Sequence, residues 1–249
     1  MVHFQAELIK WYDKHKRDLP WRHTKDPYKI WLSEIILQQT RVAQGLSYYQ
    51  KFISTHPTVS SLARASEEEV LNLWKGLGYY SRARNLHKTA RQVQDEFKGE
   101  FPNTYNGLIK LTGVGPYTAA AISSFCFDEP RAVLDGNVFR VLSRLYDVPT
   151  PINTTQGQKE FSELAEAILN SKHPAKHNQA MMEFGALQCA PKNPQCPRCP
   201  VLVECLSHNN GTVENRPQKI KKTKKKLSLI HISEPTRQEA ISYAVFCLK

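Results

Sequence analysis

Long apolar segments are missing from this chain of 249 residues. No apolar run approaches the ~20 residues that a membrane-spanning helix needs, and the N-terminus lacks the apolar core of a secretory signal. Alternating apolar and polar residues, which are typical of half-buried strands, are missing too, and no segment repeats at a fixed period. We therefore expect an all-α, cytoplasmic protein whose cysteines are reduced or bound to a metal.

Acidic residues are scarce relative to basic ones, 23 against 34, which gives a formal net charge of +11 and a pI near 9.4. Such a balance favours a polyanionic partner, with nucleic acid as the first candidate and a membrane surface as the second. Seven of the basic residues lie in residues 216–226 (RPQKIKKTKKK), which is typical of a solvated linker. Without them the net charge falls to +4, so the folded part is still basic.

Most of the chain up to residue 210 has the pattern of short helices separated by turns. Asp26 and Pro27 predict the start of a helix that runs to about Phe52. Ser66, followed three residues later by Glu69, has the form of a capping box. A chain of this length can bury a substantial core in one compact unit or two modest lobes.

Residues 111–122 (LTGVGPYTAAAI) predict two short helices joined by a glycine turn. Gly113 and Gly115 allow the backbone to turn tightly and to approach another surface closely. Pro116 suits the first turn of the second helix, where free N–H groups attract phosphate. Taken alone, this pattern fits an ordinary turn between two helices equally well.

Four cysteines, Cys189, Cys196, Cys199 and Cys205, follow one another with the spacing C-x6-C-x2-C-x5-C. Their loop is too short to bury a core of its own, so four thiols in a reducing compartment predict a metal centre. Zinc sites usually contain two paired C-x2-C units, whereas a single compact loop also suits a cubane iron–sulfur cluster. The spacing favours the cluster and leaves zinc open, while Cys126 is expected in the core.

Two carboxyl groups are candidate catalytic residues. Asp135 precedes a helix that we expect Asn137 to cap, and an ordinary turn aspartate is an equal alternative. Glu34 falls on an apolar helix face, where burial raises its pKa and allows it to hold a proton near neutrality. The alternative for Glu34 is a buried ion pair with Arg17 or Arg22. One protonated and one ionised carboxyl would suit cleavage of a glycosidic bond.

Together these features resemble the helix-hairpin-helix DNA glycosylases of the endonuclease III superfamily and, within it, the adenine-specific MutY family. The resemblance covers about residues 4 to 210. Its markers, in one order, are residues 19–21 (LPW), 31–40 (WLSEIILQQT), 73–80 (LWKGLGYY), 111–119 (LTGVGPYTA), 134–137 (LDGN) and the four-cysteine loop. The glycine turn alone would be a weak marker, but six markers in one order are specific.

The resemblance implies an all-α fold of two lobes with the DNA between them. The first lobe would span residues 20–130 and contain the helix-hairpin-helix. The second would combine residues 1–19 with 131–210 and carry a [4Fe–4S] cluster in the loop 189–205. A basic linker at 211–226 would follow.

The resemblance also assigns roles around the reaction. Glu34 matches the general acid at N7 of adenine, Asp135 the carboxylate that stabilises the sugar cation, and Asn137 a residue that positions them. Tyr117 replaces the lysine with which endonuclease III-like enzymes form a Schiff base and cut the strand. A phenol does not form a Schiff base, so the expected enzyme is monofunctional and leaves an abasic site.

The remaining matched positions are expected to contact DNA, and three groups of them are distinguished. Gly113, Val114 and Gly115 would hold the phosphate backbone, while four residues would surround the opposite 8-oxoguanine, with the ring of Tyr79 intercalated: Gln39, Thr40, Leu77 and Tyr79. Four others would line the pocket for the flipped adenine: Arg17, Trp21, Leu37 and Gln179. Leu77 also fits a simple core position.

The expected activity is removal of adenine mispaired with 8-oxoguanine or with guanine in double-stranded DNA. We expect the protein to act as a monomer, to associate with the nucleoid of a bacterium and to bind no membrane. A thymine glycosylase acting on T:G mismatches is the first alternative, and a non-catalytic iron–sulfur DNA-binding module is the second. Residues 227–249 do not resemble the 8-oxoguanine-reading domain that follows the linker in the MutY family. We expect this tail to be truncated or spurious, and disordered, which puts discrimination for 8-oxoguanine in doubt.

Overall fold

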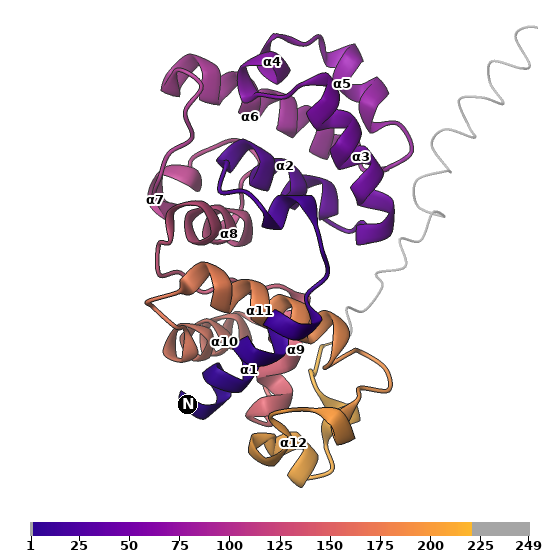
Figure 1. Ribbon diagram of the computed structural model, residues 1–249, viewed down its shortest axis with the longest axis vertical. Coiled ribbons are helices and arrows are strands. Elements are labelled where there is room, and N and C mark those ends of the chain that lie inside the picture. Colours follow the sequence, from indigo (N-terminus) through magenta and orange to yellow (C-terminus); the bar gives the residue numbers. More distant parts are fainter. Residues whose placement is uncertain (1, 221–249) are drawn as a thin grey trace, which may run out of the picture. The chain divides into compact units, whose positions relative to one another are not determined.

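The computed structural model describes residues 2–220, and this part of the chain forms helices and turns without a β-strand (Figure 1). The α-helices are α1 (Val2–His15), α2 (Pro27–Leu37), α3 (Val42–Thr55), α4 (Val59–Arg64), α5 (Glu67–Trp74), α6 (Ser81–Phe97), α7 (Tyr105–Leu108), α8 (Pro116–Phe127), α9 (Gly136–Leu145), α10 (Thr155–Ile168), α11 (Pro174–Leu187) and α12 (Leu206–Asn209). The predicted all-α class is confirmed. The tail 227–249 and the end of the predicted linker lie outside the described residues.

Membrane-crossing helices are not found between residues 2 and 220, because none there is both long and apolar enough.

Several helices begin where a side chain accepts a hydrogen bond from the first turn. The predicted capping box is confirmed at α5, where Ser66 Oγ accepts from the Glu69 N–H at 3.2 Å and Glu69 Oε2 accepts from the Ser66 N–H at 2.8 Å. Asp26 caps α2 by accepting from the Tyr28 N–H at 3.0 Å. Caps of this kind satisfy N–H groups that lack a partner within the helix.

The prediction of one helix from Pro27 to about Phe52 is wrong, because the helix is interrupted between α2 and α3. Gln39 adopts a left-handed conformation with φ of 57°, which costs roughly 1–3 kcal/mol in a residue with a side chain. The local sequence contains neither glycine nor proline here. At this break Arg82, which is distant in the sequence, donates hydrogen bonds to the carbonyl oxygens of Ile35 and Ile36.

Residues up to Gln218 pack as one compact unit that contains two hydrophobic cores. Helices α2 to α8 surround the first core, around the fully buried Trp31, Phe52 and Trp74. Helices α1 and α9 to α11 surround the second, around Phe161 and Phe184 (Figure 1). Full burial of one such side chain contributes about 1.5–3 kcal/mol, so each core is a substantial source of stability. The predicted lobe boundaries stay a prediction.

The helices that carry the candidate residues pack against one another across the two cores. Helix α2 packs on α8, α8 packs on α11, and α11 packs on both α9 and α1. Gly185 allows α11 to approach α9 closely, because a Cβ at this position would lie 2.8 Å from the Asn137 carbonyl oxygen. This packing brings Glu34, Tyr117 and the start of α9 to one place.

Candidate active site

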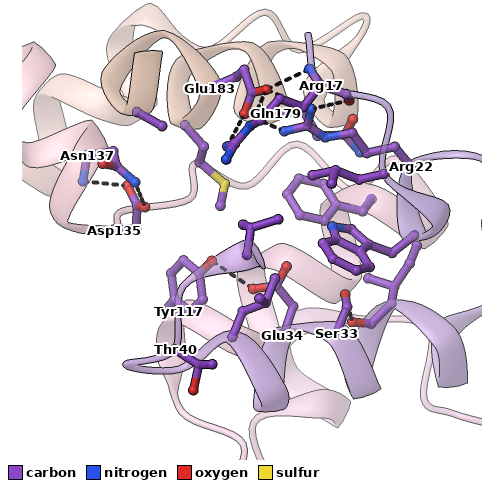
Figure 2. A pocket seen from close by; sticks show the side chains of 18 residues that line it. Arg17, Arg22, Ser33, Glu34, Thr40, Tyr117, Asp135, Asn137, Gln179 and Glu183 are labelled. Carbon is purple, nitrogen blue, oxygen red and sulfur yellow. Dashed lines mark hydrogen bonds and ion pairs between the residues drawn. The ribbon is translucent and has the colours of Figure 1, made fainter. Parts of the chain in front are cut away.

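A cavity of about 230 Å³ lies where α2, α8, α9 and α11 meet, and Figure 2 shows its lining from close by. Eight of the predicted catalytic and adenine-pocket residues line it: Arg17, Trp21, Glu34, Leu37, Tyr117, Asp135, Asn137 and Gln179. Thr40 also lines this cavity, although it is predicted to lie near the opposite base. The structure thus brings the predicted catalytic and adenine-pocket positions together.

Glu34 lies on α2, and only 8% of its surface is exposed. The Tyr117 hydroxyl, from α8, donates a hydrogen bond of 2.7 Å to Glu34 Oε2 (Figure 2). Burial raises the pKa of Glu34 to about 7, the charge of Asp135 adds to this rise, and the Tyr117 hydrogen bond opposes it. The carboxyl is therefore able to exchange a proton near neutral pH.

Asp135 is the residue that caps α9, and the expectation that Asn137 caps this helix is wrong. The Asp135 carboxylate accepts hydrogen bonds from the backbone N–H groups of Asn137 and Val138, at 2.9 and 2.7 Å. The Asn137 side-chain amide donates a third bond of 2.6 Å to Asp135 Oδ2. Burial raises the pKa of Asp135 above its ordinary value, while these hydrogen bonds oppose the rise.

The two carboxyl groups therefore have different surroundings. Asp135 accepts three hydrogen bonds, two of them from the first turn of a helix, where negative charge is favoured. Glu34 accepts one bond from Tyr117 among apolar neighbours such as Ile30 and Leu37. Environments of this kind separate the pKa values of neighbouring carboxyls and assign acid and base roles to them.

Glu183, which sequence reasoning did not single out, forms an ion-pair cluster in the wall of the cavity (Figure 2). Arg17 and Arg22 approach Glu183 Oε2 at 2.6 and 2.7 Å, and the Glu183 side chain is 1% exposed. Burial works to raise its pKa, but the hydrogen bonds from both arginines lower the pKa to about 2. The alternative in which Glu34 is the buried partner of these arginines is therefore wrong.

Gln179 and Trp21 also line the cavity. The Tyr12 hydroxyl, from α1, donates a hydrogen bond of 2.8 Å to Gln179 Oε1 and so fixes the amide. Trp21 packs edge-on against the ring of Tyr49, with 5.1 Å between the ring centroids. A planar apolar wall next to a fixed amide is suited to a small planar ligand.

The residues predicted to contact DNA outside the cavity lie on turns. Gln39 and Tyr79 are exposed and have positive φ values of 57° and 48°. Leu77 is only 8% exposed and belongs to the first core, in agreement with the simpler interpretation of that residue. Its contact with DNA stays a prediction.

The glycine turn between α7 and α8 has the predicted helix–turn–helix form. Gly113 needs its positive φ of 73°, and a Cβ there would lie 2.8 Å from the Asn85 Cβ. Gly115 has an ordinary φ of −89°, and a Cβ there would have no atom within 4 Å. The backbone between Gly113 and α8 is consequently accessible, while the Val114 side chain is buried.

The four cysteines of the loop 189–205 lie near one another and near α9. Arg144 Nη1 lies 3.5 Å from Cys189 Sγ, and burial together with the neighbouring thiols raises the pKa of Cys199 to about 12. Between residues 2 and 220, however, no three His, Cys, Asp or Glu side chains converge in a way that would hold a single metal ion. Cys126 is buried in the first core, as predicted.

Comparisons with known proteins place these features in a family. Residues 32–167 match the family described as "HhH-GPD superfamily base excision DNA repair protein". An adenine DNA glycosylase of Buchnera aphidicola (subspecies Baizongia pistaciae) is 42% identical over 89% of this chain and 64% of its own length. The human adenine DNA glycosylase is 43% identical over 81% of this chain and 39% of its own length.

The chain therefore spans less than two thirds of the length of these relatives. A solved structure of a thermostable thymine-DNA glycosylase is 30% identical, covers 83% of this chain and 95% of its own, and has a TM-score of 0.75. The predicted helix-hairpin-helix glycosylase fold is thereby confirmed. The chain belongs to the HhH-GPD superfamily of base excision DNA repair proteins.

Proposed function

We propose that this protein is a monofunctional adenine DNA glycosylase that acts, as a monomer, on adenine opposite 8-oxoguanine or guanine in double-stranded DNA. The observation that carries the proposal is the buried Glu34, hydrogen-bonded to Tyr117 in the same cavity as Asp135. Relatives named adenine DNA glycosylases at 42% and 43% identity support the choice of adenine.

The proposed reaction begins when the flipped adenine enters the cavity and Glu34 gives its proton to N7 of the base. The bond between C1′ of the sugar and N9 then breaks, and its electron pair leaves with the purine. Asp135 carries the negative charge that stabilises the positive sugar. Water adds its oxygen to C1′ and loses a proton, which leaves an abasic site.

Strand cleavage would require an amine that adds to C1′ and forms a Schiff base. Among the described residues that line the cavity there is no lysine, and its cations are Arg17 and Arg22. A guanidinium group is not such an amine, and both are paired with Glu183. We therefore expect base removal alone.

Duplexes that contain A:8-oxoguanine, A:G, T:G or thymine glycol, each with and without alkali after incubation, test this proposal. We expect strand breaks with adenine substrates, and only after alkali. Breaks without alkali would show a bifunctional enzyme. Release from T:G duplexes alone would favour the second candidate, a thymine glycosylase, which the similar fold of the thymine-DNA glycosylase at 30% identity suggests.

The rate of base release should fall as the pH rises above about 7. Because burial raises the pKa of Glu34 to about 7, the acid is protonated below that pH and loses its proton above it. Single-turnover rates between pH 6 and 9 should decline about tenfold per unit on the alkaline side. A flat profile over this range would remove Glu34 from the acid role.

We also propose that Cys189, Cys196, Cys199 and Cys205 hold a [4Fe–4S] cluster. The thiols lie near one another, and a cluster of four irons is larger than one ion, so its ligands need not converge on a point. When bound, the cluster supplies four iron–thiolate bonds that cross-link the loop 189–205.

Cys199→Ala should therefore lose most of the iron and acid-labile sulfide that the wild-type chain contains. Both are measured per chain after anaerobic purification. Cys126→Ala is the matched control, because Cys126 lies in the first core, and it should retain the wild-type content. Zinc in place of iron and sulfide in the wild-type protein would contradict the proposal.

A further inference from the structure

The guanidinium group of Arg82 binds the C-terminal end of α2. Its Nη1 donates to the carbonyl oxygens of Ile35 and Ile36, at 3.1 and 3.2 Å, and to that of Gln38. These are carbonyls that the end of a helix leaves without an N–H partner, and a cation is favoured there. Arg82 therefore stabilises the end of α2, which lies within the segment that the sequence predicts to be one continuous helix.

The same guanidinium also supports the turn at residues 75–80. It lies 5.1 Å from the centroid of the Trp74 ring and 5.7 Å from that of the Tyr79 ring. Trp74 in turn donates from Nε1 to the Gly78 carbonyl oxygen at 2.9 Å. A guanidinium over an aromatic ring attracts it, so Arg82 contacts the Tyr79 ring as well as the end of α2.

Both supported turns present an exposed side chain on a strained backbone. Gln39 and Tyr79 each adopt positive φ, and 67% of the Tyr79 surface is exposed. Such conformations persist only where the surroundings enforce them. An exposed aromatic ring with a fixed backbone is suited to stack between bases, which is how side chains offset the unstacking of a duplex.

Helix α6, which carries Arg82, also supports the glycine turn. Thr89 Oγ1 donates to the Thr112 carbonyl oxygen, and Gln92 Oε1 accepts from the Thr112 N–H at 2.9 Å. Residues 82, 89 and 92 are spaced so that they lie on one face of a helix. The two turns and the glycine turn are consequently held by one rigid element.

We propose that Arg82 is a positioning residue that holds the turns at 38–41 and 75–80 in register, so that Gln39 and Tyr79 enter the duplex together and drive the target base into the cavity. This proposal rests on the proposed glycosylase function. Arg82 itself acts through the two turns and does not touch the reacting atoms.

Arg82→Met tests the proposal, because it preserves much of the side-chain volume and removes the guanidinium. On a fully paired A:8-oxoguanine duplex, we expect the single-turnover rate to fall by about tenfold, the loss of about 1.4 kcal/mol of stacking. Fluorescence of 2-aminopurine at the target position should report less unstacking. With adenine opposite an abasic site, where extrusion is easier, the rate should return to within about twofold of wild type.

Arg84→Met is the matched control. Arg84 is an exposed arginine two residues further along the same helix, and it pairs with Glu67. It should behave as wild type on both duplexes, and Arg82→Lys should recover part of the paired-duplex rate through its charge. Equal losses for Arg82→Met on both duplexes, or no loss on either, would overturn the proposal. A wild-type chain that releases no base from any duplex would instead refute the proposed function.

Discussion

Glu34→Gln should lower the single-turnover rate of base release by about 10²–10⁴-fold, the usual contribution of a general acid. Glutamine preserves the size of the side chain and accepts the Tyr117 hydrogen bond, but it has no carboxyl proton to donate. The affinity for duplex DNA should be unchanged, because Glu34 lies inside the cavity and not on the exposed turns. Single-turnover kinetics and equilibrium binding to an A:8-oxoguanine duplex separate the two effects.

Glu68→Gln is the matched control for this substitution. Glu68 is an exposed glutamate in the first turn of α5, far along the chain from the cavity lining. The control should retain the wild-type rate and pH profile. If Glu34→Gln released base at the wild-type rate, the acid would have to be another group, and the alkaline decline above pH 7 would need another cause.

Glu34→Gln should be more stable than wild type at alkaline pH, although it should be less active. In the folded chain the pKa of Glu34 is raised from an ordinary 4.5 to about 7, so the native state binds a proton over this window that the unfolded state has released. Stability from this group is present below about pH 4.5 and is lost as the pH rises to about 7. We expect the variant to unfold at a higher denaturant concentration than wild type at pH 8, and with a smaller difference at pH 5.

Much of the site is predictable from the sequence because its chemistry is local. Glu34 stands among Ile30, Trp31 and Leu37 at helical spacing, and this pattern alone predicts a buried carboxyl with a raised pKa. The turn at Gly113 is equally local, because a left-handed backbone favours glycine. Helix propensity, caps and the absence of alternating patterns suffice for the all-α class.

The features that escaped prediction depend on residues distant in the sequence. At the interruption after Leu37, the guanidinium of Arg82 satisfies carbonyls more than forty residues earlier in the chain. The Glu183 cluster joins residues more than 160 positions apart. The sequence does carry a signal for Glu183. This residue follows Met181 and Met182 and precedes Phe184, so it is a carboxyl in an apolar stretch, like Glu34.

Glu183→Ala should destabilise the protein by about 3 kcal/mol, the lower end of the range for a broken buried ion pair, because it leaves Arg22, 12% exposed, and Arg17, 38% exposed, without their shared partner. The Glu183 carboxylate accepts from the Arg17 backbone N–H at 2.8 Å as well as from both guanidinium groups. These bonds tie the segment before α2 to α11. Chemical denaturation with the midpoint and slope both fitted measures the loss, and Glu163→Ala, on the exposed face of α10, should stay within about 0.5 kcal/mol of wild type.

The pH dependence distinguishes a lost ion pair from lost packing at this site. Hydrogen bonds from the arginines lower the pKa of Glu183 to about 2 against an ordinary 4.5, so its contribution is fully present above about pH 4.5 and disappears as the pH falls towards 2. The stability difference between wild type and Glu183→Ala should therefore shrink across this acidic window. A difference that stays constant down to pH 2 would mean that the methylene groups of Glu183, and not its charge, join the two segments. In that case Glu183→Gln would unfold at the same denaturant concentration as wild type at neutral pH.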